Sequence, residues 1–89
     1  MPKYVIEREM PQAGQMPAAQ LKDASQKSSC AMQELGHIHW VQSYVTDNKI
    51  YCVYVAPNEE AVRAHAAKAG LPVTRVEVVR TMADAATGE

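Results

Sequence analysis

GHIHWVQSYVTDNKIYCVYVAP, residues 36–57, is the stretch that decides the fold of this chain. It contains two segments rich in Val, Ile, Tyr and Trp, residues that are enriched in strands, and Asp47 and Asn48 lie between them. Turn residues between two such segments are a strong signal for a β-hairpin. We therefore predict a hairpin with Asp47 and Asn48 as its two-residue loop.

The loop fixes which side chains share a face. In the register that it sets, Tyr44 lies opposite Tyr51, and opposed residues point to the same side of the sheet. One predicted face is mostly small or aliphatic and suits packing against helices: His39, Val41, Ser43, Val45, Ile50, Cys52, Tyr54 and Ala56. The other is a surface of aromatic rings and valines with one glutamine: Trp40, Gln42, Tyr44, Tyr51, Val53 and Val55. Both faces are therefore expected to be covered.

Two helices and two outer strands flank the hairpin. Pro17 is favoured at a helix start, and Gly36 is a typical helix end. Asn58 is a natural N-cap for a second helix, which Gly70 ends. Alternating side chains predict the outer strands. The predicted elements are a strand at 3–9, a helix at 17–35, a helix at 59–69 and a last strand at 73–82.

This order of elements predicts an α+β domain with the ferredoxin-like βαββαβ topology over residues 1–82. Both helices then cover one face of an antiparallel sheet, and the other face stays open. An open face of aromatic rings and valines on a small protein implies a partner, and a second copy is the simplest one. We predict a homodimer that packs through this face. Residues 83–89 are too poor in apolar side chains to order themselves, so we expect a disordered tail.

Composition argues against several classes of protein. The net charge of −1 is spread along the chain, which leaves no basic surface for nucleic acid. No apolar run approaches the roughly 20 residues of a membrane span, and the N-terminus lacks the layout of a signal peptide. Cys30 and Cys52 show no CxxC spacing, so we expect two reduced, buried thiols. The expectation is a cytoplasmic chain with neither a nucleic-acid nor a membrane partner.

His37 and His39 are the first candidates for a chemical role. Residues i and i+2 of a strand point to the same side, so both imidazoles are expected to reach one metal ion. Imidazole suits Zn, Cu, Ni and Fe, and the pair alone does not select among them. The alternative is two ordinary polar residues at a helix–strand junction.

His65 is the third candidate. It lies in the second helix, one position away from a buried stripe of Val62, Ala66 and Ala69, and is expected to approach Tyr54 or Cys52. A half-buried structural histidine is the simpler reading. A Cys52–His65 nucleophile and base would need an open, electropositive pocket, which a valine-rich core strand does not suggest.

Several stretches resemble a family of small bacterial proteins carried as a domain of unknown function, whose characterised actinobacterial member binds nickel. They are YVIERE at 4–9, the run from ELGHIHW to RAHA at 34–66 and V-x-x-V-R-T at 76–81, and SYVTDNKIYCVYVAPNEE at 43–60 is the most specific. The resemblance implies a ferredoxin-like homodimer that holds nickel ions at its surface and sequesters them rather than catalysing a reaction. It supplies no ligands, so His37, His39 and His65 remain the candidates.

Two hypotheses of different classes follow. The leading one is a homodimeric, non-enzymatic protein of metal homeostasis that binds nickel or another divalent transition metal. The alternative is a small dimeric enzyme or ligand sensor with a pocket between sheet and helices around His65. An interaction module without a small ligand is a third reading.

Overall fold

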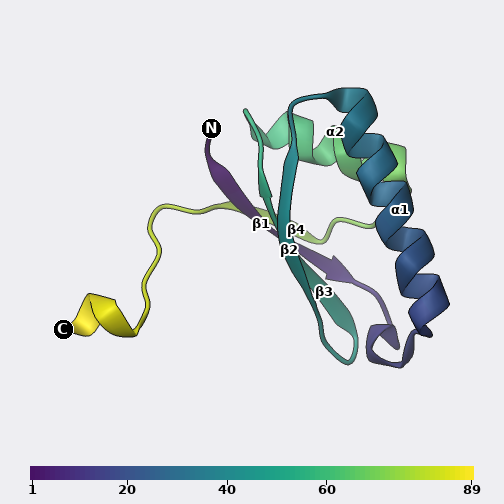
Figure 1. Ribbon diagram of the computed structural model, residues 1–89, viewed down its shortest axis with the longest axis horizontal. Coiled ribbons are helices and arrows are strands. Elements are labelled where there is room, and N and C mark those ends of the chain that lie inside the picture. Colours follow the sequence, from purple (N-terminus) through teal and green to yellow (C-terminus); the bar gives the residue numbers. More distant parts are fainter.

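Two helices cover one face of a four-stranded antiparallel sheet in the computed structural model, which describes all 89 residues (Figure 1). The strands lie in the order β2-β3-β1-β4, with every neighbouring pair antiparallel. This is the predicted ferredoxin-like arrangement. The elements in chain order are β1 (Lys3–Glu9), α1 (Ala18–Leu35), β2 (His39–Val45), β3 (Lys49–Val55), α2 (Glu59–Ala69) and β4 (Arg75–Val78), with short 3-10 turns η1 (Ala13–Gln15) and η2 (Ala85–Gly88).

Local sequence signals set the helix ends as predicted. The Asn58 side chain accepts a hydrogen bond from the backbone N–H of Ala61 at 2.9 Å, which caps α2. Gly36 and Gly70 follow the two helices in the left-handed conformation, with φ of 85° and 73°. Glycine adopts this conformation without the steric cost that a Cβ brings, so both helices end there.

The hairpin register holds near the turn and then shifts. Tyr44 pairs with Tyr51 and Gln42 with Val53, as predicted, but Trp40 pairs with Tyr54 and His39 with Val55. The irregularity lies between Trp40 and Gln42, where an extra residue in one strand interrupts the pairing as in a β-bulge.

The shift exchanges the faces of the first residues of β2. Trp40, predicted on the open face, instead packs partly buried against the core and donates its indole N–H to the Ser43 hydroxyl at 2.9 Å. His39, predicted to face the helices, pairs with Val55 of the open face and is exposed. Both facing predictions were wrong, because a hairpin register carried back from the turn does not include a bulge.

The core lies between the sheet and the helices. Alternate residues of β1 and β3 point into it, and Val62 of α2 closes it. His65, predicted to lie just off the α2 stripe, is fully buried beside Val62 and Ala66. Cys30, predicted to be buried, is exposed on α1. The main cluster consists of Tyr4, Ile6, Met32, Ile38, Cys52, Tyr54, Ala56 and Val62.

The connection from β1 to α1 is fastened to the tip of the hairpin. Backbone N–H groups of Met10 and Gly14 donate to the carbonyls of Asn48 and Asp47, at 3.0 and 3.1 Å. A Cβ at Gly14 would lie 3.0 Å from both the Thr46 carbonyl oxygen and the Asp47 Cα. A larger residue would press on these backbone atoms, so glycine suits this close approach of the two loops.

The last ten residues leave the sheet and are exposed throughout. Figure 1 shows them running outward to η2, a turn that Asp84 caps through the backbone N–H groups of Ala86 and Thr87. Disorder of residues 83–89 stays a prediction. Neither helix of the fold has the length and apolar character needed to cross a membrane.

Candidate functional site

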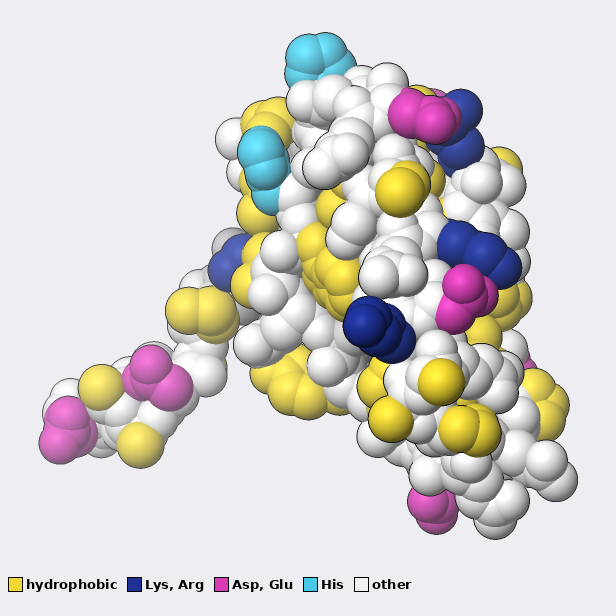
Figure 2. Space-filling view, turned by 45° about the vertical axis from the view of Figure 1, so that its right-hand side comes forward, with side chains coloured by type: hydrophobic (Ala, Val, Ile, Leu, Met, Phe, Trp, Pro, Cys, Tyr) yellow, Lys and Arg dark blue, Asp and Glu magenta, His cyan; other side chains and the backbone are white.

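His37 and His39 both lie exposed at the entrance to β2, with the buried Ile38 between them. Figure 2 shows two histidine side chains standing out from one end of the molecule. Nowhere in the chain do three His, Cys, Asp or Glu side chains come together in a group able to hold a metal ion. A metal bound by these histidines would therefore complete its coordination with water or with ligands from a second molecule.

A surface hollow of about 280 Å³ lies beside His37. It is formed where the end of α1 meets the start of α2, and Asn58 and Glu60 line it together with His37. The Asn58 side chain is engaged in capping α2. Glu60 has an exposed carboxylate that takes part in none of the ion pairs. His37 and Glu60 are thus the pair of imidazole and carboxylate that this hollow offers to a cation.

The open face of the sheet carries exposed apolar side chains next to His39. Tyr44 is 55% exposed, and its hydroxyl accepts a hydrogen bond from the Gln42 amide. Tyr51, Val53 and Val55 of β3 are half-buried. Five of the six predicted interface residues therefore share this face, and Trp40 does not. The dimer itself stays a prediction.

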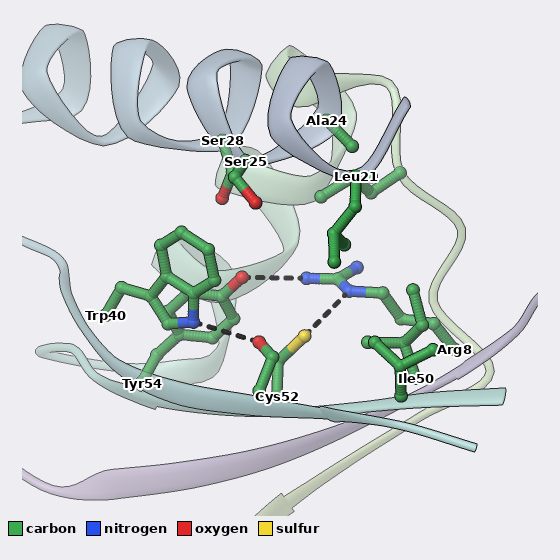
Figure 3. A pocket seen from close by; sticks show the side chains of 12 residues that line it. Arg8, Leu21, Ala24, Ser25, Ser28, Trp40, Ile50, Cys52 and Tyr54 are labelled. Atoms are coloured by element: carbon green, nitrogen blue, oxygen red, sulfur yellow. Dashed lines mark hydrogen bonds between the residues drawn. The ribbon is translucent and has the colours of Figure 1, made fainter. Parts of the chain in front are cut away.

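The helix-covered side of the sheet holds an unusual polar cluster around Arg8 of β1. Arg8 is 1% exposed. Its guanidinium donates to the Pro72 carbonyl oxygen at 2.7 Å, to the Cys52 sulfur at 3.4 Å and to the Tyr54 hydroxyl at 3.4 Å. Figure 3 shows the guanidinium hydrogen-bonded to the last two groups, beneath Leu21 of α1. None of the three partners is a carboxylate.

His65 adjoins this cluster from α2, with its ring 5.1 Å from that of Tyr54 between centroids. Its Nε2 lies 3.1 Å from the Ser28 carbonyl oxygen and 3.2 Å from the Ser28 hydroxyl. A carbonyl only accepts, so Nε2 carries the proton and Nδ1 is left as a buried acceptor without a partner. Burial, helped by the nearby Arg8 charge, lowers the pKa of His65. The imidazole is therefore neutral at pH 7.

A cavity of about 50 Å³ opens beside Arg8, between α1 and the β2–β3 hairpin. Its walls are almost wholly apolar, although three serines are among the lining residues. Burial raises the pKa of Tyr54, with Cys52 adding to the rise and Arg8 opposing it, so Tyr54 stays a neutral phenol in this wall. Besides Arg8, Cys52 and Tyr54, the lining residues are Leu21, Ala24, Ser25, Ser28, Trp40, Ser43, Val45, Ile50 and Leu71.

The three candidate histidines lie in different surroundings. His37 lines the hollow between the helix ends, His39 lies on the open face opposite Val55, and His65 is buried with Ser28 and Tyr54. That His37 and His39 share one metal ion stays a prediction. Cys52 and His65 are not hydrogen-bonded to each other, because Cys52 accepts from Arg8 and His65 bonds to Ser28. Sequence reasoning missed the role of Arg8. Its signal was the alternation of β1, which places residue 8 on the same side as Tyr4 and Ile6.

A solved structure and a protein-family model both match this chain. The crystal structure of SCO4226 from Streptomyces coelicolor A3(2) matches with a TM-score of 0.76 and 24% sequence identity, covering 91% of this chain and 99% of that one. This likeness shows the same fold. No curated protein sequence matches the chain. The model of the family described as nickel responsive protein SCO4226-like matches residues 4–79, and the chain belongs to that family.

Proposed function

We propose that this protein is a homodimeric nickel-binding protein that acts in cytoplasmic metal homeostasis or sequestration, and that it is not an enzyme. One observation carries the proposal: two exposed histidines, His37 and His39, flank a buried residue at the start of an edge strand in a chain of a nickel responsive family. Imidazole is a good ligand for Ni(II), and carboxylate and water are acceptable ones.

The incomplete ligand set fits buffering better than catalysis. A catalytic metal is held by several protein ligands that neighbouring groups orient, whereas the surface histidines here have neither. Such a site exchanges its metal readily, which suits storage and release. Glu60 is the carboxylate that we assign to the His37 side of the site, because both line the same hollow.

The position of His39 also links metal binding to dimerisation in this proposal. His39 lies on the open face, opposite Val55. A second molecule packed on this face would contact His39 directly. It would then supply further ligands to a metal ion bound by His39. Tyr44, Tyr51, Val53 and Val55 give the face the apolar content that such an interface needs.

Two further observations support the cytoplasmic location and the non-enzymatic role in this proposal. Cys30 and Cys52 are free thiols, which fits a reducing compartment. The buried Cys52 and His65 each bond to another residue, which leaves no assembled nucleophile and base.

The test is calorimetric titration of the metal-free protein with Ni(II), Zn(II) and Co(II). We expect Ni(II) binding that is lost in the His37→Ala/His39→Ala variant and retained in Gln26→Ala, a control at an exposed position of α1. No heat with any of the metals up to about 1 mM, the weak end of useful affinity, would refute metal binding.

A second pair of variants tests the assigned carboxylate. Glu60→Gln is expected to weaken Ni(II) binding, because it removes a charged oxygen ligand and leaves the shape unchanged. Glu9→Gln is the matched control, since Glu9 is equally exposed and lies on β1. Equal affinity in the two variants would remove Glu60 from the site and leave the histidine proposal standing.

A further inference from the structure

One cavity of the molecule takes no part in the proposed metal site. It measures about 50 Å³, lies between α1 and the β2–β3 hairpin, and shares no residue with the hollow beside His37. Its walls are almost wholly apolar, and Leu21, Trp40 and Ile50 are among the lining residues. Because protein interiors are close-packed, side chains around a void lack part of the contacts that packed side chains make. A bound molecule of matching polarity would supply these contacts.

The buried polar groups around this cavity already have partners inside the protein. All three nitrogens of Arg8 donate to protein atoms, and the Trp40 indole N–H donates to the Ser43 hydroxyl (Figure 3). The one buried side-chain nitrogen or oxygen without a partner is Nδ1 of His65, which does not line the cavity. A buried water needs roughly two to four polar partners. The cavity therefore favours an apolar molecule over water.

The cavity reaches the surface beside two exposed apolar side chains. Leu21 of α1 and Val45 of β2 both line it, and each is 40% exposed. These two residues belong to the two elements between which the cavity lies, so a small molecule has a way in from solvent. Ligand sites in proteins are concave and mostly apolar. A molecule longer than the cavity would extend outward between Leu21 and Val45.

The volume and the lining together set the class of ligand. About 50 Å³ has room for roughly three to five non-hydrogen atoms, at about 10–15 Å³ for each water-sized group. This is the size of a short alkyl chain. A charged group in the cavity would lose its hydration and find no free partner in the wall, which is costly. The enclosed part of the ligand is therefore both small and uncharged.

We propose that this cavity is a binding site for a small uncharged apolar molecule, or for the alkyl end of a longer neutral one. The enclosed part, roughly three to five non-hydrogen atoms, lies against Trp40 and Ile50. Any remainder lies between Leu21 and Val45 at the surface. The site goes beyond nickel binding and shares none of the residues of the metal site, so either proposal can fail while the other stands.

Trp40 gives the test its readout, because it is the one tryptophan in the chain and it lines the cavity. The probe is 1-bromopropane, a neutral molecule of the right size whose bromine quenches indole fluorescence on contact. Its charged analogue is 3-bromopropionate. With 1-bromopropane we expect saturable quenching and a dissociation constant of roughly 0.1–5 mM, the affinity that so few atoms allow. With 3-bromopropionate we expect only weak quenching that rises linearly with concentration.

Two variants then locate the site. Ala24→Leu enlarges a half-buried residue of the lining and fills the cavity, so the saturable quenching should be lost. The rise in melting temperature that 1-bromopropane causes in the wild type should be lost with it, since a ligand that binds the folded state stabilises it. Ala64→Leu makes the same change at an exposed position of α2 outside the cavity, and it should behave as the wild type does. Should Ala24→Leu fail to fold, the comparison of the neutral and charged probes in the wild type still decides.

Three results would overturn the proposal. The first is quenching by 1-bromopropane that stays linear up to about 10 mM, which would mean that the molecule only collides with Trp40. The second is an equal, saturable response to 3-bromopropionate. The third is saturable quenching that Ala24→Leu leaves unchanged, because the bound molecule would then lie outside the cavity.

Discussion

The two faces of the sheet differ in a way that reverses the usual distribution of polarity. On the helix-covered face, the charged Arg8 and the neutral His65 are sealed in the core, at 1% and 0% exposure. On the open face, tyrosine and valine side chains meet water. The polarity of a side chain therefore does not by itself predict whether that side chain is buried in this protein. The helix-covered face buries a charge that no carboxylate pairs with, and the open face leaves apolar side chains uncovered.

The largest expected effect separates the two faces through two neighbouring residues of β1. Ile6 is fully buried among the helices, whereas Val5 pairs with Val53 on the open face. Ile6→Ala should lower the free energy of unfolding by about 2–5 kcal/mol, because it leaves a cavity in the core. Val5→Ala should cost less than about 1 kcal/mol in the monomer. Urea unfolding at low protein concentration measures both, and equal losses would mean that the open face is covered.

A second experiment uses pH to examine the buried face. The pKa of His65 is lowered in the folded state, so the unfolded chain binds more protons once the pH falls below the ordinary value of about 6.5. Stability is then full above this value and falls as the pH drops below it, by at most about 1.4 kcal/mol per pH unit. The slope of unfolding free energy between pH 7 and 5 should largely disappear in His65→Gln. His37→Gln, at the surface, is the control and should keep the slope.

A third prediction concerns Arg8 and runs against the expectation for an ordinary core residue. Arg8→Met should change the free energy of unfolding by less than about 1 kcal/mol, because the hydrogen bonds that it loses are offset by removal of a buried charge that no carboxylate compensates. Chemical denaturation of the two proteins tests it. A loss of several kcal/mol would show that the hydrogen bonds of Arg8 hold the fold together.

The smallest effect on stability is expected on the open face, where the effect on assembly should be large. Tyr44→Ser should leave the monomer within about 0.5 kcal/mol, as exposed substitutions usually do. If the open face is the dimer interface, the same change should shift sedimentation toward the monomer. Thr46→Ser, at the exposed hairpin tip, is the control for assembly. A wild type that sediments as a monomer at every concentration would refute the dimer.

Much of the fold was predictable because its signals are local. Asp47 and Asn48 fixed the hairpin turn, and Asn58, Gly36 and Gly70 fixed the helix ends, each through its own backbone chemistry. The burial of His65 was also within reach, since Val62, His65 and Ala66 follow the spacing of one helix face. The last strand was predicted too long. It ends at Val78, with one further hydrogen bond from the Val79 N–H to the Lys3 carbonyl.

The site was less predictable, because it depends on long-range geometry. No local sequence pattern predicts the bulge near Val41. Because of this bulge, Trp40 lines the cavity and His39 lies on the open face. Arg8 comes into contact with Cys52, Tyr54 and Pro72, which lie 44 to 64 positions away in the chain. A charged residue in a strand is also expected at the surface, so alternation and charge gave opposite answers for Arg8.

The bulge has a second consequence, for the outer edge of the sheet. β2 is an edge strand, and an unpaired strand edge is a template onto which another strand can add. The irregularity at Val41 interrupts the regular row of backbone donors and acceptors along β2. The other edge strand, β4, spans only Arg75–Val78, and every second side chain in it is charged. Uncontrolled growth from edge to edge is thereby discouraged at both sides of the sheet. If two copies pack through their open faces as proposed, the contact ends with two molecules instead of continuing into a fibre.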